Sequence, residues 1–449
     1  MPSNVLTSRL FGDMFGLKEM REIFTDEALV ARYLEVEAAL ARAQGRLGII
    51  PADAARAIDA AAGALEIDWD TLRDRTLIVG YPILPLVEQI AAKVPGGAGQ
   101  YAHWGATTQD IMDTADALQV QAGLAIVARE LDAIGLALAK LADEHAETPM
   151  PGRTHLQHAL PISFGYKAAT WLSAIDRHRE RLKQLRPRVE VVSFSGASGT
   201  LASLAGEGLA TQKALAAELG LGIPDITWHT IRDNFSEATG LLALVAGSLG
   251  KIGYDIMLMM QTETGEVMEP FVAGRGASST MPQKRNPISS EMMLAAAKIV
   301  REAHAAMLDA MVVDHERATG QWHVEWQALP TAFITASGGL QAAREALEGL
   351  EVRPTAMRRT LDASGGLIVA EAVMMGLAPH IGRQHAHELV YGCCRKALTG
   401  GGSFIEALQA EPEVAKHLDA AALARLTDPV NYLGEAPEMV RRLLARRAG

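Results

Sequence analysis

Apolar residues recur at alternating spacings of four and three along two stretches of the chain, which indicates a coiled-coil-like seam on a long α-helix in each. No proline lies between Phe235 and Glu269, so the second helix can extend over about 30 residues, or roughly 45 Å. Glycines inside this helix cost stability, and we expect close approach of a neighbouring helix as compensation. The seam positions are Val120, Leu124, Val127, Leu131, Ile134, Leu138 and Leu141, then Leu242, Val245, Leu249, Ile252, Ile256 and Met259; the glycines are Gly240, Gly247, Gly250 and Gly253.

Three more long helical runs accompany these two, and five long helices favour an all-α bundle over a compact α/β domain. The composition agrees, because 49% of residues are hydrophobic but only 5% are aromatic, so the apolar mass is mostly helix-forming. An N-terminal helix should begin near Asp26, a plausible N-cap, and end at Gly48–Pro51. The other predicted runs are 161–186, 288–312 and 327–350, with a second, shorter helical region at about 52–98.

We expect three parts along the 449 residues: an N-terminal helical domain at 1–105, a central long-helix bundle at 106–354, and a C-terminal helical cap domain at 355–449. The last boundary rests on the shorter helices after Pro354 and on the glycines at 400–402. The apolar faces of the long helices are too wide for one monomer to cover. The bundle therefore predicts an oligomer, most simply a homotetramer.

Charge and cysteine content narrow the class of partner. A formal net charge of −11 argues against a nucleic-acid partner, which needs a basic face, but it does not forbid an anionic substrate. Cys393 and Cys394 are adjacent and make no disulfide framework, which suits a reducing cytoplasm. Neither a signal peptide nor an uncharged apolar run of membrane-spanning length is visible, so we expect no membrane partner and a cytoplasmic location.

One segment, 274–287, breaks the helical pattern sharply. It begins with glycines, continues with two serines, and ends with a lysine, an asparagine and a proline that opens the next helix. A mobile loop with a hydroxyl, an ammonium and an amide can close over a carboxylate. The run reads Gly274-Arg275-Gly276-Ala277-Ser278-Ser279-Thr280-Met281-Pro282-Gln283-Lys284-Arg285-Asn286-Pro287.

This run resembles the signature loop of the fumarase/aspartase superfamily, Gly-Ser-Ser-x-Met-Pro-x-Lys-x-Asn-Pro. Ala277 stands where the pattern has Gly, and the other defined positions match, including those of Ser279 and Met281. The resemblance implies that Ser278 is the general base, made alkoxide-like by nearby donors and by exclusion of water. It implies that Lys284 and Asn286 hold the substrate carboxylate and stabilise the aci-carboxylate formed when the α-proton leaves.

Two further segments are similar to the same superfamily. In 101–110, Thr107 and Thr108 would donate to a carboxylate at a helix N-terminus, with His103 beside them; the alternative is an ordinary N-cap. In 152–161, His155 matches the histidine that protonates the leaving group in adenylosuccinate lyase and its relatives. That resemblance makes His155 the second catalytic residue, flanked by Thr154 and Gln157 as substrate contacts.

Resemblance over nearly the whole chain is strongest to the bacterial 3-carboxy-cis,cis-muconate cycloisomerase branch, which closes a tricarboxylic muconate to a lactone. It rests on 103–110, on Ser195-Gly196-Ala197-Ser198-Gly199-Thr200-Leu201, on Trp228-His229-Thr230 with Arg232-Asp233, and on His315-Glu316-Arg317, Trp322-His323 and Asp428-Pro429. Arg232 and Arg317 are candidate carboxylate contacts, with a structural ion pair as the alternative for each. The branch implies no cofactor and no metal. His315, His323 and Glu325 are spaced like one helix face, but no His-Glu-x-x-His pattern supports a metal site there.

Two features leave the substrate open. Cycloisomerases of this branch often carry Trp at the position of His155, and a histidine there resembles adenylosuccinate lyase, which releases an amine. Against that reading, Trp326 stands where adenylosuccinate lyases typically have Arg, which weakens any case for a nucleotide phosphate. A small polycarboxylate is the expected substrate. Muconate lactonisation leads, a C–N lyase releasing fumarate from an N-substituted aspartate is the alternative, and a non-catalytic crystallin-like relative is a second alternative that retention of Ser278, Lys284 and Asn286 disfavours.

Overall fold

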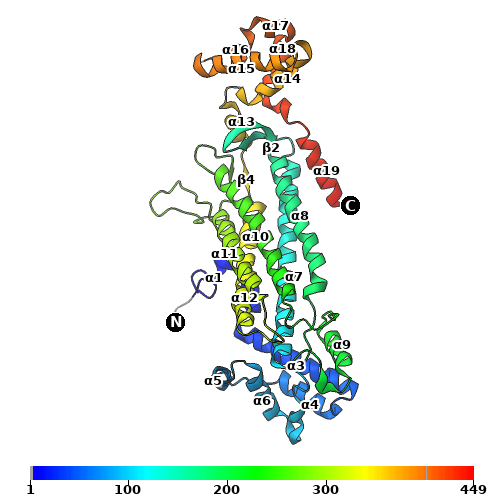
Figure 1. The fold of residues 1–449 in the computed structure, drawn as a ribbon. Helices are drawn as coiled ribbons and strands as arrows, with labels where there is room; N and C mark the ends of the chain where they lie inside the picture. The colour runs from blue at the N-terminus through cyan, green and yellow to red at the C-terminus, as the bar shows by residue number, and fades with distance from the viewer. Residues whose placement is uncertain (1–3, 401, 449) are drawn as a thin grey trace. The chain divides into compact units, whose positions relative to one another are not determined.

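The computed structural model describes residues 4–400 and 402–448, and nearly all of its regular structure is α-helical (Figure 1). The prediction of an all-α fold with five long helices in its middle part is confirmed. Four strands of two to seven residues form two small antiparallel pairs, of which β1–β2 is a hairpin and β3–β4 joins segments distant in sequence. The long helices are α3 (Asp26–Leu47), α7 (Thr108–Glu144), α8 (Phe164–Val189), α10 (Asp233–Met259), α11 (Ile288–Ala310) and α12 (Gln321–Glu348).

The two predicted apolar seams lie on α7 and α10, and every one of their positions is buried, from Val120 to Leu141 and from Leu242 to Met259. Close approach of a neighbouring helix is observed at Gly240 and is absent at Gly247. A Cβ on Gly240 would lie 3.2 Å from Cε1 of His304, whereas Gly247 has nothing within 4 Å. The hydrophobic period therefore located the buried face correctly, while glycine alone did not identify a helix contact.

Some element boundaries differ from the predictions. Residues 161–163 belong to β2 (Gln157–Ser163), which pairs antiparallel with β1 (Pro149–Thr154), instead of starting the next helix. The N-cap of α3 is Thr25, whose hydroxyl accepts the Ala28 N–H at 3.1 Å. Helix α12 begins six residues before the predicted start, because Trp322 and Glu325 in its first turns are buried and bonded to Asp113 and Arg232. The helix also continues through Pro330.

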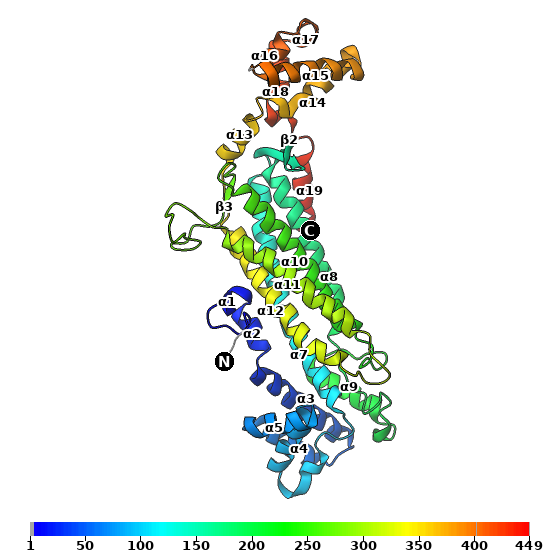
Figure 2. The same ribbon diagram turned by 60° about the vertical axis from the view of Figure 1, so that its left-hand side comes forward.

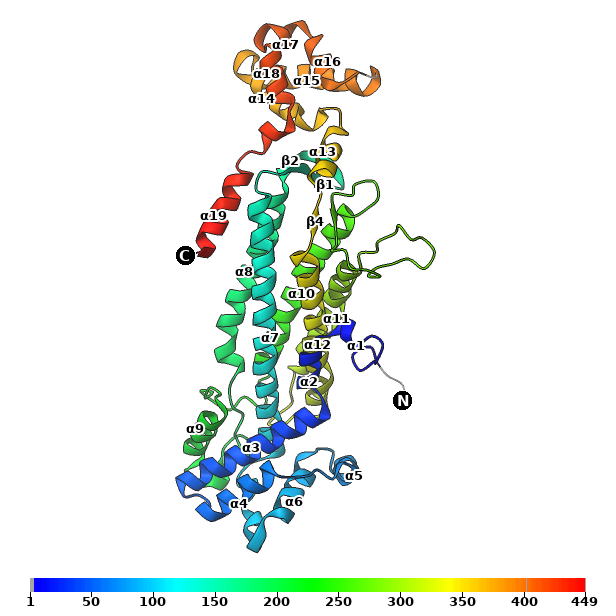
Figure 3. The same ribbon diagram turned by 180° about the vertical axis from the view of Figure 1, so that it is seen from behind.

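The chain packs as two compact units, each described by itself. Unit 1 comprises the described residues of 4–131, 178–249 and 292–341. In unit 1, helix α3 packs against both α4 and α9, and Figure 3 shows these two helices next to it. The predicted three-domain division stays a prediction. The shorter elements of unit 1 are α1 (Gly12–Phe15), α2 (Lys18–Ile23), α4 (Ala52–Gly63), α5 (Trp69–Val79), α6 (Ile83–Lys93), η1 (Pro95–Tyr101), η2 (Ala202–Leu204) and α9 (Gly208–Leu219).

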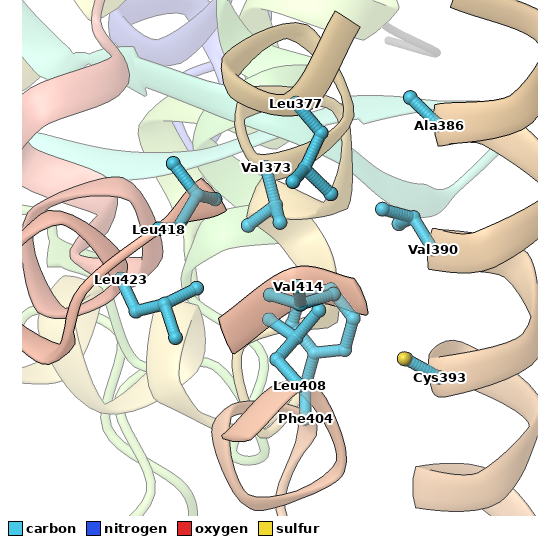
Figure 4. Packing of buried hydrophobic residues seen from close by; sticks show 10 residues of the cluster. All are labelled: Val373, Leu377, Ala386, Val390, Cys393, Phe404, Leu408, Val414, Leu418 and Leu423. Atoms are coloured by element: carbon cyan, nitrogen blue, oxygen red, sulfur yellow. The ribbon is translucent and has the colours of Figure 1, made fainter. Parts of the chain in front are cut away.

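Unit 2 comprises the described residues of 132–177, 250–291 and 342–448. Its last part has a small apolar core of its own, to which Phe404, Leu408 and Val414 contribute (Figure 4). Cys393 points into this core as a free thiol and packs there as a small apolar side chain. The elements are β3 (Val267–Met268), β4 (Glu351–Val352), α13 (Pro354–Asp362), η3 (Leu367–Val369), α14 (Ala370–Ile381), α15 (Arg383–Gly400), α16 (Phe404–Gln409), α17 (Pro412–His417), α18 (Ala420–Thr427), η4 (Pro429–Tyr432) and α19 (Ala436–Ala448).

Helix α10 is long and apolar enough, by length and composition, to cross a membrane, and it is the one unbroken helix of that kind in the described part of the chain. Half of its most apolar window is buried within the chain. Core helices of soluble proteins have the same length and composition, so this property is weak evidence for a membrane span.

Candidate active site

The threonine segment forms the N-terminus of α7. The Thr107 N–H donates to Oδ2 of Asp110 at 3.0 Å, so the first turn is closed by a carboxylate and the threonine hydroxyls are not used for capping. Within residues 4–400 and 402–448, the hydroxyls of Thr107 and Thr108 make no hydrogen bond. They lie at the positive end of a 37-residue helix, where an anion is stabilised.

Asp110 joins α7 to the glycine-containing segment Ser195–Leu201. Its Oδ1 accepts the N–H and the hydroxyl of Ser195 at 2.8 and 3.1 Å, and its Oδ2 accepts the Gly196 N–H at 2.9 Å. Burial raises the pKa of Asp110 to about 6, although these hydrogen bonds and the one from Thr107 oppose the rise. The Asp110 carboxylate thus joins the start of α7 to the Ser195–Leu201 segment, and burial makes its charged form unfavourable.

Arg232 lies in a buried ion-pair cluster. Its Nη1 donates to Oδ2 of Asp113 at 2.7 Å and its Nε to Oε1 of Glu325 at 2.9 Å, and only 1% of its surface is exposed. Burial alone would lower its pKa, but the Asp113 and Glu325 carboxylates raise it above the ordinary value of arginine. The structure shows the ion pair that was the alternative for Arg232, with Asp113 and Glu325 as its partners, and a contact of Arg232 with a substrate carboxylate stays a prediction.

Arg317 is placed differently, because it has only neutral acceptors. Nη1 donates to Oε1 of Gln109 at 2.6 Å and Nη2 to the carbonyl oxygen of Ala197 at 2.8 Å. It forms no ion pair with any carboxylate in the described part of the chain. Gln109 in turn donates to Oδ2 of Asp113 and to the carbonyl oxygen of His229. A half-buried guanidinium without a counter-charge is suited to a carboxylate ligand.

His103 is paired with a buried glutamate that the sequence analysis did not single out. Its Nδ1 lies 2.6 Å from Oε1 of Glu37, whose side chain is fully buried on α3. Burial would lower the pKa of His103, but the charge and hydrogen bond of Glu37 overcome this and raise it. The raised pKa favours the cationic imidazole, the form that binds a substrate carboxylate.

The signature loop connects β3 with α11, and Figure 2 shows it as a long excursion of the ribbon between them. Its base is anchored. Arg285 pairs with Glu351 at 2.9 Å, Arg275 pairs with Glu345 at 2.7 Å, and the buried Glu269 accepts the N–H groups of residues 289 and 290. Gly276 has φ of 66°, and a Cβ there would lie 2.6 Å from the carbonyl oxygen of Asn286, so this position requires glycine.

Ser278 sits in a small turn at the start of the loop tip. Its Oγ accepts the N–H groups of Thr280 at 3.3 Å and Met281 at 3.1 Å. Two N–H donors directed at one hydroxyl oxygen stabilise a negative charge on it, as an alkoxide base requires. Ser279, Met281 and Lys284 are exposed on the same tip, and Asn286 is half-buried with its N–H bonded to the carbonyl oxygen of Gly276 at 3.0 Å.

His155 lies at the tip of the β1–β2 hairpin, exposed, between Thr154 and Gln157, which face each other across the strands. His155 and Leu156 form the two-residue turn with φ of 52° and 63°, and Leu156 is 78% exposed. Non-glycine residues in this left-handed region cost about 1–2 kcal/mol each. Strain of this kind concentrates at functional sites.

Within one chain, no hydrogen bond among the described residues connects His155, the predicted acid, with Ser278, the predicted base. The structure does join Gln109, Arg317 and the Ser195–Leu201 segment. His315, with φ of 47°, lies before α12 and so does not share a helix face with His323 and Glu325 as expected. No group of three or more His, Cys, Asp or Glu side chains is placed to hold a metal ion among residues 4–400 and 402–448.

Sequence reasoning missed Glu37, Asp113 and the environment of His229, and it considered Asp110 for capping without its bonds to Ser195 and Gly196. A signal for Glu37 was present, because it follows Tyr33 by one helical turn and precedes Gln44 by two on the buried side of α3. A carboxylate on such a face needs a partner. Asp110 and Asp113 are likewise one turn apart on the buried side of α7.

Comparison with known proteins gives consistent matches over the whole chain. A family model described as Lyase matches residues 17–301, and one described as Adenylosuccinate lyase C-terminus matches residues 366–443. Trans-aconitate decarboxylase 1 of Mycosarcoma maydis is 48% identical over 97% of this chain and 88% of its own length. The 3-carboxy-cis,cis-muconate cycloisomerase of Pseudomonas aeruginosa is 46% identical over 99% of this chain and 97% of its own. The crystal structure of fumarate lyase from Mesorhizobium sp. BNC1 has a TM-score of 0.91 and 56% identity, covering 96% of this chain and 98% of that one.

Proposed function

This chain belongs to the fumarase/aspartase superfamily of lyases, and we propose that it converts 3-carboxy-cis,cis-muconate to its lactone. The observation that carries the proposal is the signature loop, in which Ser278 Oγ faces two N–H donors and Lys284 and Asn286 follow at the family's spacing. Similarity to a muconate cycloisomerase over almost the full length supports the substrate.

The proposed chemistry adds a substrate carboxylate oxygen to a carbon–carbon double bond. The C–O bond forms at one alkene carbon, and the electron pair of the double bond moves to the other carbon, which lies next to a second carboxylate. Lys284 and Asn286 stabilise the resulting aci-carboxylate, and the Ser278 hydroxyl delivers a proton to that carbon. In the reverse elimination, Ser278 as alkoxide removes the same proton.

A C–N lyase that releases fumarate from an N-substituted aspartate is the second candidate, and His155 favours it. An amine leaving group needs a proton, which an imidazole supplies near neutral pH. The strained, exposed turn that presents His155 supports a catalytic role in either reaction. In lactonisation His155 would bind a carboxylate at the outer end of the substrate, with Thr154 and Gln157 beside it.

We further propose a homotetramer with active sites shared between subunits, in a reducing cytoplasm. The sharing is supported by the absence of any hydrogen bond between His155 and Ser278 among the described residues, because catalysis needs both groups near one substrate. The two free cysteines support the compartment. In the shared site Thr107, Thr108, His103 and Arg317 would come from one subunit, and the loop and the hairpin from others.

The experiment is a substrate comparison with the purified full-length protein. Loss of the conjugated-diene absorbance is followed with 3-carboxy-cis,cis-muconate, and adenylosuccinate, an S-succinyl thioether and trans-aconitate run in parallel. Rapid loss with muconate alone supports lactonisation. Fumarate released from an amine or thioether adduct without muconate turnover would replace it with the second candidate, and carbon dioxide released from trans-aconitate would replace both.

A further inference from the structure

His229 is a buried imidazole that the proposed chemistry does not use. It lies in the loop before α10 and is 5% exposed, and no side chain bonds to either ring nitrogen; the Glu316 backbone lies close to the ring without forming a well-aligned hydrogen bond. An unpaired buried polar side chain is costly, and most native structures avoid it. Replacing it with an apolar side chain would remove that cost, so its presence calls for a ligand.

The groups around the imidazole define the chemistry it can bind. Burial is the largest cause that lowers the pKa of His229, and the positive charges of Arg317 and the buried Arg232 lower it further. The Asp113 carboxylate and the nearby Glu316 backbone raise it. The net shift is downward, so the ring is neutral near pH 7 and offers one N–H donor and one acceptor. A cation beside a neutral donor is the arrangement that holds a carboxylate, with one oxygen on each.

The segment Ser195–Leu201 covers this position. A Cβ on Gly199 would lie 2.9 Å from Cε1 of His229, so the glycine backbone rests directly on the ring. Asp110 holds the start of the segment, and a backbone hydrogen bond from Leu201 to Ser195 closes it. Between these two ends, the segment is bonded to Arg317, whose Nη2 donates to the Ala197 carbonyl oxygen.

We propose that His229 and Arg317 form a second carboxylate subsite, covered by Ser195–Leu201 until a substrate carboxylate displaces the Ala197 carbonyl from Arg317. A carboxylate is a stronger acceptor for a guanidinium than a neutral carbonyl is. Once the Ala197 tether is exchanged, the two positive-φ glycines, Gly196 and Gly199, allow the segment to lift from the ring. The inference rests on the proposed function and extends it: the substrate carries a carboxylate beyond the one that the signature loop holds.

The test is direct binding, so that it does not depend on turnover. Full-length protein and its His229→Leu and His229→Gln variants are titrated calorimetrically with tricarballylate, an unreactive tricarboxylate, and with succinate, which lacks the extra carboxylate. We expect His229→Leu to weaken tricarballylate binding about tenfold or more, since a hydrogen bond to a charged group supplies at least that factor. Succinate binding should change less than about threefold, and His229→Gln, which keeps a donor, should recover part of the loss.

Two controls separate a ligand contact from a packing role. His304→Leu replaces another partly buried histidine, on α11, and should leave tricarballylate binding unchanged. The thermal midpoint of His229→Leu should equal or exceed that of the wild type, because an unpaired buried polar group is removed. The Cε1–H resonance of His229, assigned by its loss in the variant, should shift when tricarballylate binds.

The subsite is refuted if His229→Leu weakens both ligands equally, or neither, or if wild-type protein binds tricarballylate no more tightly than succinate. Failure of the lactonisation proposal gives a different result. Muconate would then not be consumed, while the difference between the two ligands and its loss in His229→Leu would remain.

Discussion

Asp110→Asn tests whether burial controls the charge of the carboxylate that joins α7 to the Ser195–Leu201 segment. The pKa of Asp110 is raised from an ordinary value near 3.8 to about 6 in the folded protein. A raised pKa means that the folded state binds the proton more tightly than the unfolded state does. The resulting stability is complete below about pH 4 and is lost as the pH rises through about 6.

A shift of this size corresponds to about 3 kcal/mol at 1.36 kcal/mol for each pKa unit, most of which is lost between pH 4 and pH 7. Asparagine does not titrate, so the stability of the wild type relative to Asp110→Asn should fall by about 2–3 kcal/mol over that range. At every pH the variant also loses acceptors for the Thr107 and Gly196 N–H groups, at roughly 1–3 kcal/mol each, because its amide faces them.

The assay is urea unfolding of both proteins at one protein concentration and four pH values from 4 to 7. Subtracting the unfolding free energy of the variant from that of the wild type at each pH removes the contribution of all other titrating groups. Asp309→Asn, at an exposed position on α11, is the matched control for the loss of a surface carboxylate. A wild-type-minus-variant difference that stays constant from pH 4 to 7, or rises, would refute the reasoning, since the hydrogen bonds would then outweigh burial.

Three further predictions concern the site. Ser278→Ala should lower kcat by about 10³-fold, with a thermal midpoint near that of the wild type, because the half-buried hydroxyl contributes to catalysis and bonds only to N–H groups of its own turn. Ser279→Ala should lower kcat less, and equal losses would contradict the assignment. Glu37→Gln should lower the pKa of His103, so substrate binding should weaken at a lower pH than in the wild type when KM is measured across pH 6–9; an unchanged KM profile would exclude a charged role for His103. His155→Gly should raise stability by about 1 kcal/mol in thermal unfolding by relieving the left-handed backbone, yet lose most activity; a loss of both would indicate a structural residue.

The sequence predicted the long helices well, because hydrophobic spacing reports which face is buried whatever that face packs against. All positions of the α7 and α10 seams are buried for this reason. The β1–β2 hairpin was not predicted, since its residues include three prolines, two in β1 and one in β2, which argue against a strand. The start of α12 was placed six residues too late, because the bonds of Trp322 to Asp113 and of Glu325 to Arg232 that secure its first turns join residues distant in sequence.

The candidate site was predictable where a fixed spacing carried the chemistry, as in 274–287. It was not predictable where roles depend on partners distant in sequence. Arg232 and Arg317 have the same chemistry, but two buried carboxylates occupy Arg232 and only neutral oxygens contact Arg317. Likewise, nothing in the motif around His229 shows that its ring nitrogens lack side-chain partners. Burial and pairing of this kind are tertiary properties.

The measurement that tests the account most directly compares wild type and Ser278→Ala in single-turnover reactions with 3-carboxy-cis,cis-muconate. Enzyme is in excess, and loss of the diene absorbance is followed at fixed pH. The account predicts rapid loss with wild type and a rate about 10³-fold lower with Ser278→Ala. Equal rates in the two proteins would contradict the assignment of Ser278 as the group that transfers the proton, and with it the proposed mechanism.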